Sequence, residues 1–132
     1  MDDVLKKLRY GGQKRVLVAN APEELAGLES ALSAAGAQVH AQPDGAYPWS
    51  IVFVKSLGET EALAPVASGL IEGDGILWLA YPKGTSKRYS VDVNRDKAWP
   101  LFDGTGVRLV AQVSIDEDWS AMRLRRIEFS KA

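Results

Sequence analysis

Short apolar runs alternate with segments of helical periodicity along the first two thirds of this chain. Arg15–Ala19 (RVLVA), Ser50–Val54 (SIVFV) and Ile76–Ala80 (ILWLA) are the clearest of these runs. Runs of this length with no polar side are typical of strands that are buried on both faces, as in parallel sheets covered by helices. The alternation therefore predicts βαβ units and a mainly parallel sheet.

The segments between these runs supply the connections. Helices are expected over 22–36, where leucines recur at every third or fourth position, and over Glu59–Ile71. Ala37–Ala41 reads as a short strand, and Gln42–Trp49 reads as a loop because it contains two prolines and an Asp-Gly pair. A short helix is expected over Asn94–Phe102.

Two extended runs close the chain. Arg108–Ile115 and Trp119–Phe129 are separated by three acidic residues, a spacing that favours an antiparallel hairpin. The apolar residues of the second run change face, which predicts a β-bulge near Arg125. With right-handed crossovers, the fold class expected is α/β: a single three-layer Rossmann-like domain over 1–132 with a six-stranded sheet in the order 2-1-3-4-6-5.

Composition excludes several classes of protein. The 132 residues carry a net charge of −1 and no cysteine, so neither disulfides nor thiolate metal sites are possible. No apolar stretch reaches the ~20 residues of a membrane-spanning helix, and the charged start of the chain does not resemble a signal peptide. We expect a cytoplasmic protein that binds no membrane.

Two motifs carry a resemblance to known proteins. The closing hairpin resembles that of class I S-adenosylmethionine-dependent methyltransferases, here in a form shortened by one βα unit. The chain also resembles a family of small bacterial proteins known only as a domain of unknown function, whose pattern has an apolar strand with Trp ending in Pro-Lys, then Asp-Trp-Ser-Ala-x-Arg. The matching residues are Trp78, Pro82, Lys83, Asp118, Trp119, Ser120, Ala121 and Arg123.

The chain departs from that methyltransferase pattern where the cofactor would bind. The resemblance implies a Gly-rich loop after the first strand, but the segment 16–25 reads VLVANAPEEL and contains no glycine. Glu23 and Glu24 would repel an anion at the following helix start, and only Asp44 offers a counterpart of the acid that grips the ribose. No cofactor is therefore predicted, and S-adenosylmethionine is kept as an alternative.

A basic, hydroxyl-rich loop follows the Ile76–Ala80 strand. It leaves the carboxyl edge of the sheet, where α/β proteins bind their ligands, and its lysines and hydroxyls could hold an anion. The plainer interpretation is a solvated loop, with Asn94 or Asp92 capping the next helix. The candidate ligand-binding residues are Asn20, Lys55, Ser56, Tyr81, Lys83, Ser86, Lys87 and Arg95.

The hairpin turn holds a second polar cluster. It could bind a cation or a partner, but the spacing of its acids matches no metal motif, and Asp118 or Ser120 could instead accept bonds from turn amides. Trp119 is expected to pack on a helix and Arg123 to pair with a nearby acid. The cluster, with a structural or partner-binding role, comprises Asp116, Asp118, Trp119, Ser120 and Arg123.

The remaining aromatic and basic residues point to no catalytic chemistry. His40 is the single histidine and has no nucleophile or second ligand at a useful spacing, so neither catalysis nor a transition-metal site is expected. Trp78 is predicted to be core, Trp99 to cover the sheet and Trp49 to be partly exposed. The basic stripe over 123–126 is too small for nucleic-acid binding at this net charge.

These observations favour a binding module over an enzyme. The expected partner is a small anion or a protein segment in a crevice above the first, third and fourth strands, with no catalytic residues assigned. The alternative is a methyltransferase relative with a remodelled S-adenosylmethionine site. A third possibility is an interaction module that works through the hairpin and Trp119.

Overall fold

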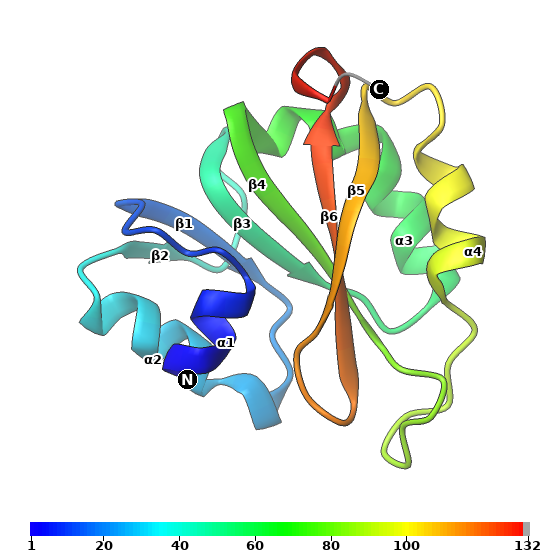
Figure 1. Cartoon of the computed structure of the whole chain (residues 1–132), viewed down its shortest axis with the longest axis horizontal. Helices are drawn as coiled ribbons and strands as arrows, with labels where there is room; N and C mark the ends of the chain where they lie inside the picture. Colours follow the sequence, from blue (N-terminus) through cyan, green and yellow to red (C-terminus); the bar gives the residue numbers. More distant parts are fainter. Residues whose placement is uncertain (131–132) are drawn as a thin grey trace.

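The computed structural model describes residues 1–130 and contains one six-stranded sheet in the order β2-β1-β3-β4-β6-β5 (Figure 1). β1, β2, β3 and β4 are parallel, whereas β6 runs antiparallel to both β4 and β5. The sheet order and the closing hairpin expected from the sequence are confirmed. The strands are β1 (Arg15–Ala19), β2 (Gln38–His40), β3 (Tyr47–Phe53), β4 (Ile71–Pro82), β5 (Val107–Ser114) and β6 (Trp119–Arg126).

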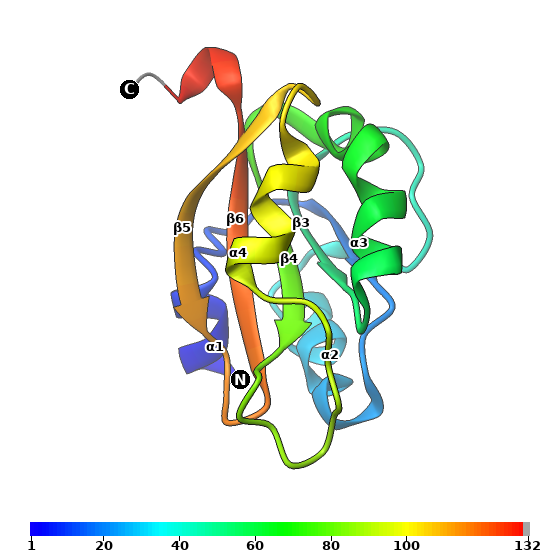
Figure 2. The ribbon, with the colours of Figure 1, turned by 90° about the vertical axis from the view of Figure 1, so that its right-hand side faces the viewer.

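Helices cover both faces of the sheet and make three layers. In Figure 1, α1 and α2 lie on one side of the strands, and α3 and α4 on the other; Figure 2 looks onto the α3 and α4 face. Within residues 1–130, no helix combines the length and apolar character that a bilayer crossing requires. The helices are α1 (Asp2–Lys7), α2 (Gly27–Ala34), α3 (Leu57–Leu63) and α4 (Arg95–Ala98), with 3-10 helices η1 (Glu23–Leu25), η2 (Ala64–Leu70), η3 (Trp99–Phe102) and η4 (Ile127–Phe129).

The sheet separates two hydrophobic cores. Successive side chains of a strand point to opposite faces, so Val16 and Val18 of β1 join the core under α1 and α2, while Leu17 and Ala19 join the core under α3 and α4. All four are buried, as expected for a strand that is covered on both sides. This arrangement explains why the β1 sequence contains no polar alternation.

The segment between β2 and β3 is a loop without a crossover helix, and a small polar cluster packs there. Tyr47 is fully buried, and its hydroxyl lies 2.7 Å from Nδ1 of His40 and accepts a bond from the Asp44 amide. The Arg15 guanidinium lies 4.1 Å from the centre of the Tyr47 ring. His40 thus contacts the hydroxyl of a buried tyrosine in this cluster.

β3 starts earlier than the sequence indicated, because Pro48 and the Asp-Gly pair made its first residues resemble a loop. Trp49 lies inside β3 and is fully buried, so the prediction that it is partly exposed is wrong. Its indole Nε1 donates to the carbonyl oxygen of Leu8 at 2.9 Å, and Nε1 of Trp78 donates to the same oxygen at 2.7 Å. Both tryptophans therefore fix the end of α1 to the sheet.

Two predictions about the last third of the chain are also wrong. The bulge lies in β5 at Val110, opposite Arg123 and Leu124, and not near Arg125. The apolar residues change face because β6 ends at Arg126 and η4 turns the chain. Trp99 is 50% exposed, and Phe102, at 2%, covers the sheet in its place.

Candidate functional site

The carboxyl ends of the parallel strands lie at one edge of the molecule, and two segments meet there. Figure 2 shows the β4–α4 loop beside the β5–β6 turn, and the Ser86 hydroxyl and Asp118 carboxylate join them with a 2.7 Å hydrogen bond. At one part of this edge, side chains of the protein bond to one another and fill the space. At another part, beside α4, a pocket is open to solvent.

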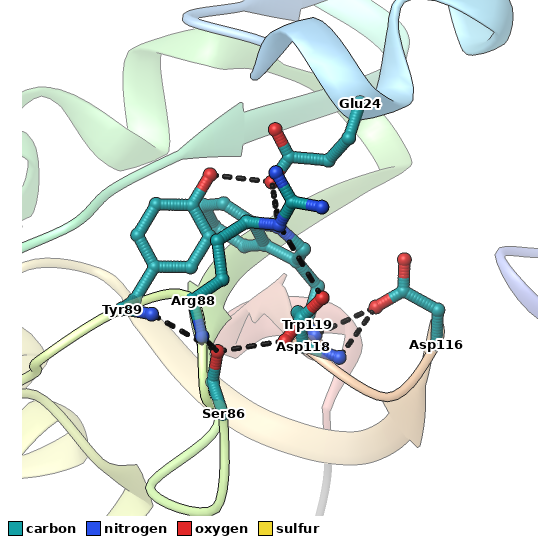
Figure 3. A network of polar contacts seen from close by, with 7 residues as sticks. All are labelled: Glu24, Ser86, Arg88, Tyr89, Asp116, Asp118 and Trp119. Atoms are coloured by element: carbon teal, nitrogen blue, oxygen red, sulfur yellow. Dashed lines mark hydrogen bonds and ion pairs between the residues drawn. The ribbon is translucent and has the colours of Figure 1, made fainter.

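The closed part is a network around Glu24, which follows β1 in η1 (Figure 3). The Tyr89 hydroxyl and Trp119 Nε1, at 3.2 Å, both donate to Oε2 of Glu24. The Arg88 Nε lies between two carboxylates, 3.8 Å from Glu24 and 3.7 Å from Asp118. We call this set the Glu24 network; its members are Glu24, Ser86, Arg88, Tyr89, Asp116, Asp118 and Trp119.

Backbone amides complete the network. Ser86 Oγ accepts bonds from the amides of Arg88 at 3.1 Å and Tyr89 at 3.2 Å, so it holds the loop in a turn. Oδ1 of Asp116 accepts bonds from the amides of Asp118 and Trp119, each at 2.8 Å. The hairpin residue whose side chain binds turn amides is therefore Asp116, and not Asp118 or Ser120 as the sequence indicated.

Each charged side chain of the network has a partner within the chain, although three carboxylates accompany the single cation Arg88. Burial alone would raise the pKa of Glu24, but the hydrogen bonds from Tyr89 and Trp119 and the charge of Arg88 outweigh it, and the pKa is lowered. Burial and the bond to Glu24 raise the pKa of Tyr89 to about 12. Trp119 is fully buried, and its ring meets Phe53 and Tyr89 edge-on at 5.3 and 5.2 Å. Trp119 thus packs on other aromatic rings and on η1 through Glu24.

Three of the predicted ligand residues are drawn into local structure near this network. Lys55 lies 5.4 Å from the centre of the Tyr89 ring, and Ser56 caps α3 by accepting the Glu59 amide at 3.1 Å. Asn20 takes a left-handed backbone conformation, φ 62°, and lines a separate apolar hollow of 330 Å³. The structure does not bring these three side chains into one crevice with Lys83.

The residues after β1 do not fit a nucleoside cofactor bound as the methyltransferase resemblance implies. Asn20, and not glycine, takes the positive φ, and the nearby Glu24 carboxylate is already bonded to Tyr89 and Trp119. Asp44, the candidate ribose acid, is 87% exposed and lies 4.0 Å from Arg15. No group of side chains suited to a metal ion occurs in residues 1–130.

The open part of the edge is a pocket of 450 Å³ beside α4, which we call the Lys83–Arg95 pocket. Lys83 Nζ donates to Ser114 Oγ at 2.6 Å, while Gln112 Nε2 donates to the Tyr81 hydroxyl at 2.6 Å. Among residues 1–130, neither Lys83 nor Arg95 forms an ion pair. The lining residues are Tyr81, Lys83, Gly84, Asn94, Arg95, Asp96, Gln112 and Ser120.

The chemistry of this pocket favours an anion. Burial raises the pKa of Tyr81, although the positive charge of Arg95 acts in the opposite direction, so the phenol stays neutral and able to form hydrogen bonds. The lining contains two cationic side chains, Lys83 and Arg95, and one carboxylate, Asp96. The pocket therefore has a surplus of positive charge beside neutral polar groups.

The structure groups four predicted residues in this pocket: Tyr81, Lys83 and Arg95 of the ligand set and Ser120 of the hairpin set. Lys87 lines a different hollow, beside Arg88 and Asp118. Arg123 does not form the expected ion pair, and its buried Nε has no hydrogen-bond partner within the described part of the chain.

Sequence reasoning missed Gln112. It lies in the expected strand over 108–115, and its position opposite Met122 in the hairpin register puts it on the α4 face. The face of β5 on which Gln112 lies could have identified it. The bulge at Val110, however, reverses the inward and outward alternation of the side chains that follow, so the sequence pattern assigns Gln112 to the wrong face.

Comparisons with known proteins support the fold alone. No protein-family model matches the sequence, and no curated protein matches it. Solved structures do match. The [4+2]-cyclase SpnF is 9% identical, with a TM-score of 0.59 over 95% of this chain and 78% of its own. The N-methyltransferase NodS from Bradyrhizobium japonicum WM9 is 14% identical, with a TM-score of 0.57 over 95% and 93%.

A third similar structure is the magnesium protoporphyrin IX methyltransferase ChlM from Synechocystis PCC 6803 with bound SAM. It is 11% identical, with a TM-score of 0.56 over 95% of this chain and 75% of that one. These likenesses show that the chain has a methyltransferase-like, Rossmann-like fold. At such identities a fold hosts many activities, so the function must be argued from the site.

Proposed function

We propose that this protein is a non-enzymatic binding module that holds a small anion in the Lys83–Arg95 pocket. One observation carries the proposal: two cationic side chains, which have no ion-pair partner within residues 1–130, line a 450 Å³ pocket together with the polar groups of Tyr81, Gln112 and Ser120. Arg presents a planar fork of donors that matches carboxylate and phosphate groups, and Lys adds a point charge.

The position of the pocket supports the proposal. It lies where β4 ends and β6 begins, and α/β sheets bind ligands beyond the carboxyl ends of their strands. The neighbouring ends of β1 and β3 lie beside the Glu24 network. A ligand can therefore enter the Lys83–Arg95 pocket, which lies at this edge, without displacing the side chains of the Glu24 network.

Thermal unfolding with inorganic phosphate, sulfate and citrate tests the proposal. An anion at ten times its Kd adds about 1.4 kcal/mol to the stability of the folded state, which raises the Tm by several degrees for a domain of this size. Lys83→Gln and Arg95→Gln should abolish the rise. The matched control is Lys97→Gln, which removes an equal charge from α4 outside the pocket. Equal rises in all four proteins would contradict the proposal.

The second candidate is a methyltransferase relative with a remodelled S-adenosylmethionine site. The fold shared with methyltransferases favours it, whereas the residues after β1 do not fit the usual binding mode. Isothermal titration with S-adenosylmethionine separates the two candidates. Our proposal predicts no heat of binding, and a saturable signal that persists in Arg95→Gln would support the methyltransferase relative.

A further inference from the structure

The Lys83–Arg95 pocket is one end of a longer groove. Arg95 also lines a hollow of 330 Å³ beside the middle of β5 and another of 480 Å³ beside η3. Gln112 is shared by the pocket and the middle hollow, and Leu109 by the middle hollow and the η3 hollow. The three hollows therefore adjoin one another along Arg95 and β5, and we call them together the Arg95 groove.

The groove's lining residues run along β5 from Val107 to Gln112 and include residues of α4 and η3. Figure 2 shows α4 on this side of the sheet. Five residue steps along a strand span about 17 Å at about 3.3 Å per residue. That length exceeds a phosphate or sulfate ion several times. A single small anion would fill one end only.

The two ends differ in chemistry. Lys83, Gln112 and Ser120 line the first end, whereas Trp99, Phe102 and Ile127 line the other. Trp99 is 50% exposed and Ile127 is 49% exposed, so two large apolar side chains face solvent in one hollow. Arg95, Asp103 and Arg108 also line that end, so one positive charge remains there as well. Arg95 thus carries positive charge along the whole groove, whereas the exposed apolar side chains of Trp99 and Ile127 lie at the η3 end.

An extended peptide is a poor fit, although β5 is the edge strand of the sheet. A peptide would add to β5 through continuous backbone pairing, but Val110 forms a bulge in the middle of the groove segment. Bulges are one of the devices by which edge strands avoid pairing with another chain. A flexible small molecule needs no such pairing.

We propose that the Arg95 groove binds an elongated amphipathic anion. Its phosphate, sulfonate or carboxylate group lies between Lys83 and Arg95, and its alkyl chain or ring lies along Leu109 to Trp99. This inference rests on the proposed function, because it uses the same anion site, and it adds the class of ligand. The flat Trp99 ring and Ile127 supply the apolar contact.

Isothermal titration with inorganic phosphate, butyl phosphate and octyl phosphate tests the inference. A fully buried methylene improves affinity about fourfold; four methylenes half buried in an open groove should improve it about fifteenfold from butyl to octyl phosphate. Trp99→Ala should remove most of that gain while leaving phosphate binding unchanged. Val66→Ala, which truncates an exposed apolar residue outside the groove, should keep the full gain.

Tryptophan fluorescence tests where the alkyl chain of the ligand lies. Trp49, Trp78 and Trp119 are fully buried and Trp99 is half exposed, so covering Trp99 with an alkyl chain should shift the emission to the blue. Trp99→Phe should abolish that shift.

Phosphate binding with no gain for octyl phosphate would overturn the inference and leave the proposed function standing. Octanol binding as tightly as octyl phosphate would also overturn it, and no binding by any of the phosphates would overturn both.

Discussion

The Glu24 network and the Arg95 groove lie at neighbouring parts of the molecule, but they use their polar side chains in opposite ways. In the network, every charged group has a partner of the chain's own: Glu24 has Tyr89 and Trp119, and Arg88 has two carboxylates. In the groove, Lys83 and Arg95 have no ion-pair partner in the described part of the chain, and Trp99 and Ile127 face solvent.

On our proposal, this difference is how the fold moves its binding surface. The β1 end, which the methyltransferase resemblance marks as the cofactor site, is closed by the β4–α4 loop and the hairpin. The network does not cover the α4 side of the sheet, where the Arg95 groove lies. Side chains that are satisfied internally contribute stability, and unpaired ones are free for a ligand, so substitutions in the two regions should separate stability from binding.

The largest expected effect on stability comes from Trp119→Ala. Removing a fully buried indole that packs on Phe53 and Tyr89 should cost about 3–5 kcal/mol, measured by urea unfolding. Trp99→Ala is the matched change in the groove and should cost about 1 kcal/mol or less, because half of that side chain is exposed. Equal losses would break the distinction between the two regions.

Ser86→Ala should have the next largest effect. The hydroxyl donates to Asp118 and accepts bonds from two loop amides. Its loss leaves the two amides without a partner and leaves Asp118 with Arg88 alone; partial exposure limits the cost to about 1–2 kcal/mol. Hydrogen exchange of the Arg88 and Tyr89 amides should accelerate in the variant. If exchange and stability are both unchanged, the serine does not hold the loop.

Glu24→Gln should give a pH-dependent loss. Because folding lowers the pKa of Glu24 from its ordinary 4.5, the stabilisation by the carboxylate is present above about pH 4.5 and is lost as the pH falls through the folded-state pKa. The variant should be about 1 kcal/mol less stable at pH 7, a value reduced for solvent exposure. The gap from wild type should shrink below pH 4.5, as urea titrations at several pH values would show. A constant gap would sink this explanation.

The smallest effect on stability is expected for Arg95→Gln. Arg95 has no ion-pair partner among residues 1–130, so the free energy of unfolding should change by less than about 0.5 kcal/mol, while anion binding is lost. A loss above 1 kcal/mol would place Arg95 among the residues that hold the fold and would weaken the assignment of the groove as a ligand site.

The fold could be predicted because its signals are local. The apolar runs of β1, β3 and β4 and the acidic turn of the hairpin each lie within a few residues, and the right-handed crossover rule then fixes the sheet order. Trp49 was misplaced for the same reason: Pro48 and the nearby Asp-Gly pair are local loop signals, and burial under α1 overrides them.

The site could be predicted only in part. Tyr81, Lys83 and Arg95 were found because they follow a strand or precede a helix at the expected edge. The contacts that close the β1 end are not readable in this way, since Glu24 and Trp119 are 95 positions apart and no periodicity links them. Glu24 was read as a charge that repels anions, whereas in the structure it binds the chain's own Tyr89.

The two indoles that donate to the Leu8 carbonyl attach the N-terminal segment firmly to the sheet. The first residues of a domain are ordinarily the first to fray, but releasing α1 here would remove the acceptor of the N–H groups of Trp49 and Trp78, both at 0% exposure. Release of α1 would break both hydrogen bonds and expose apolar surface of the two indoles to water, and both changes are costly. Detachment of this short helix should therefore coincide with global unfolding, so that a protease cannot trim it from the intact protein.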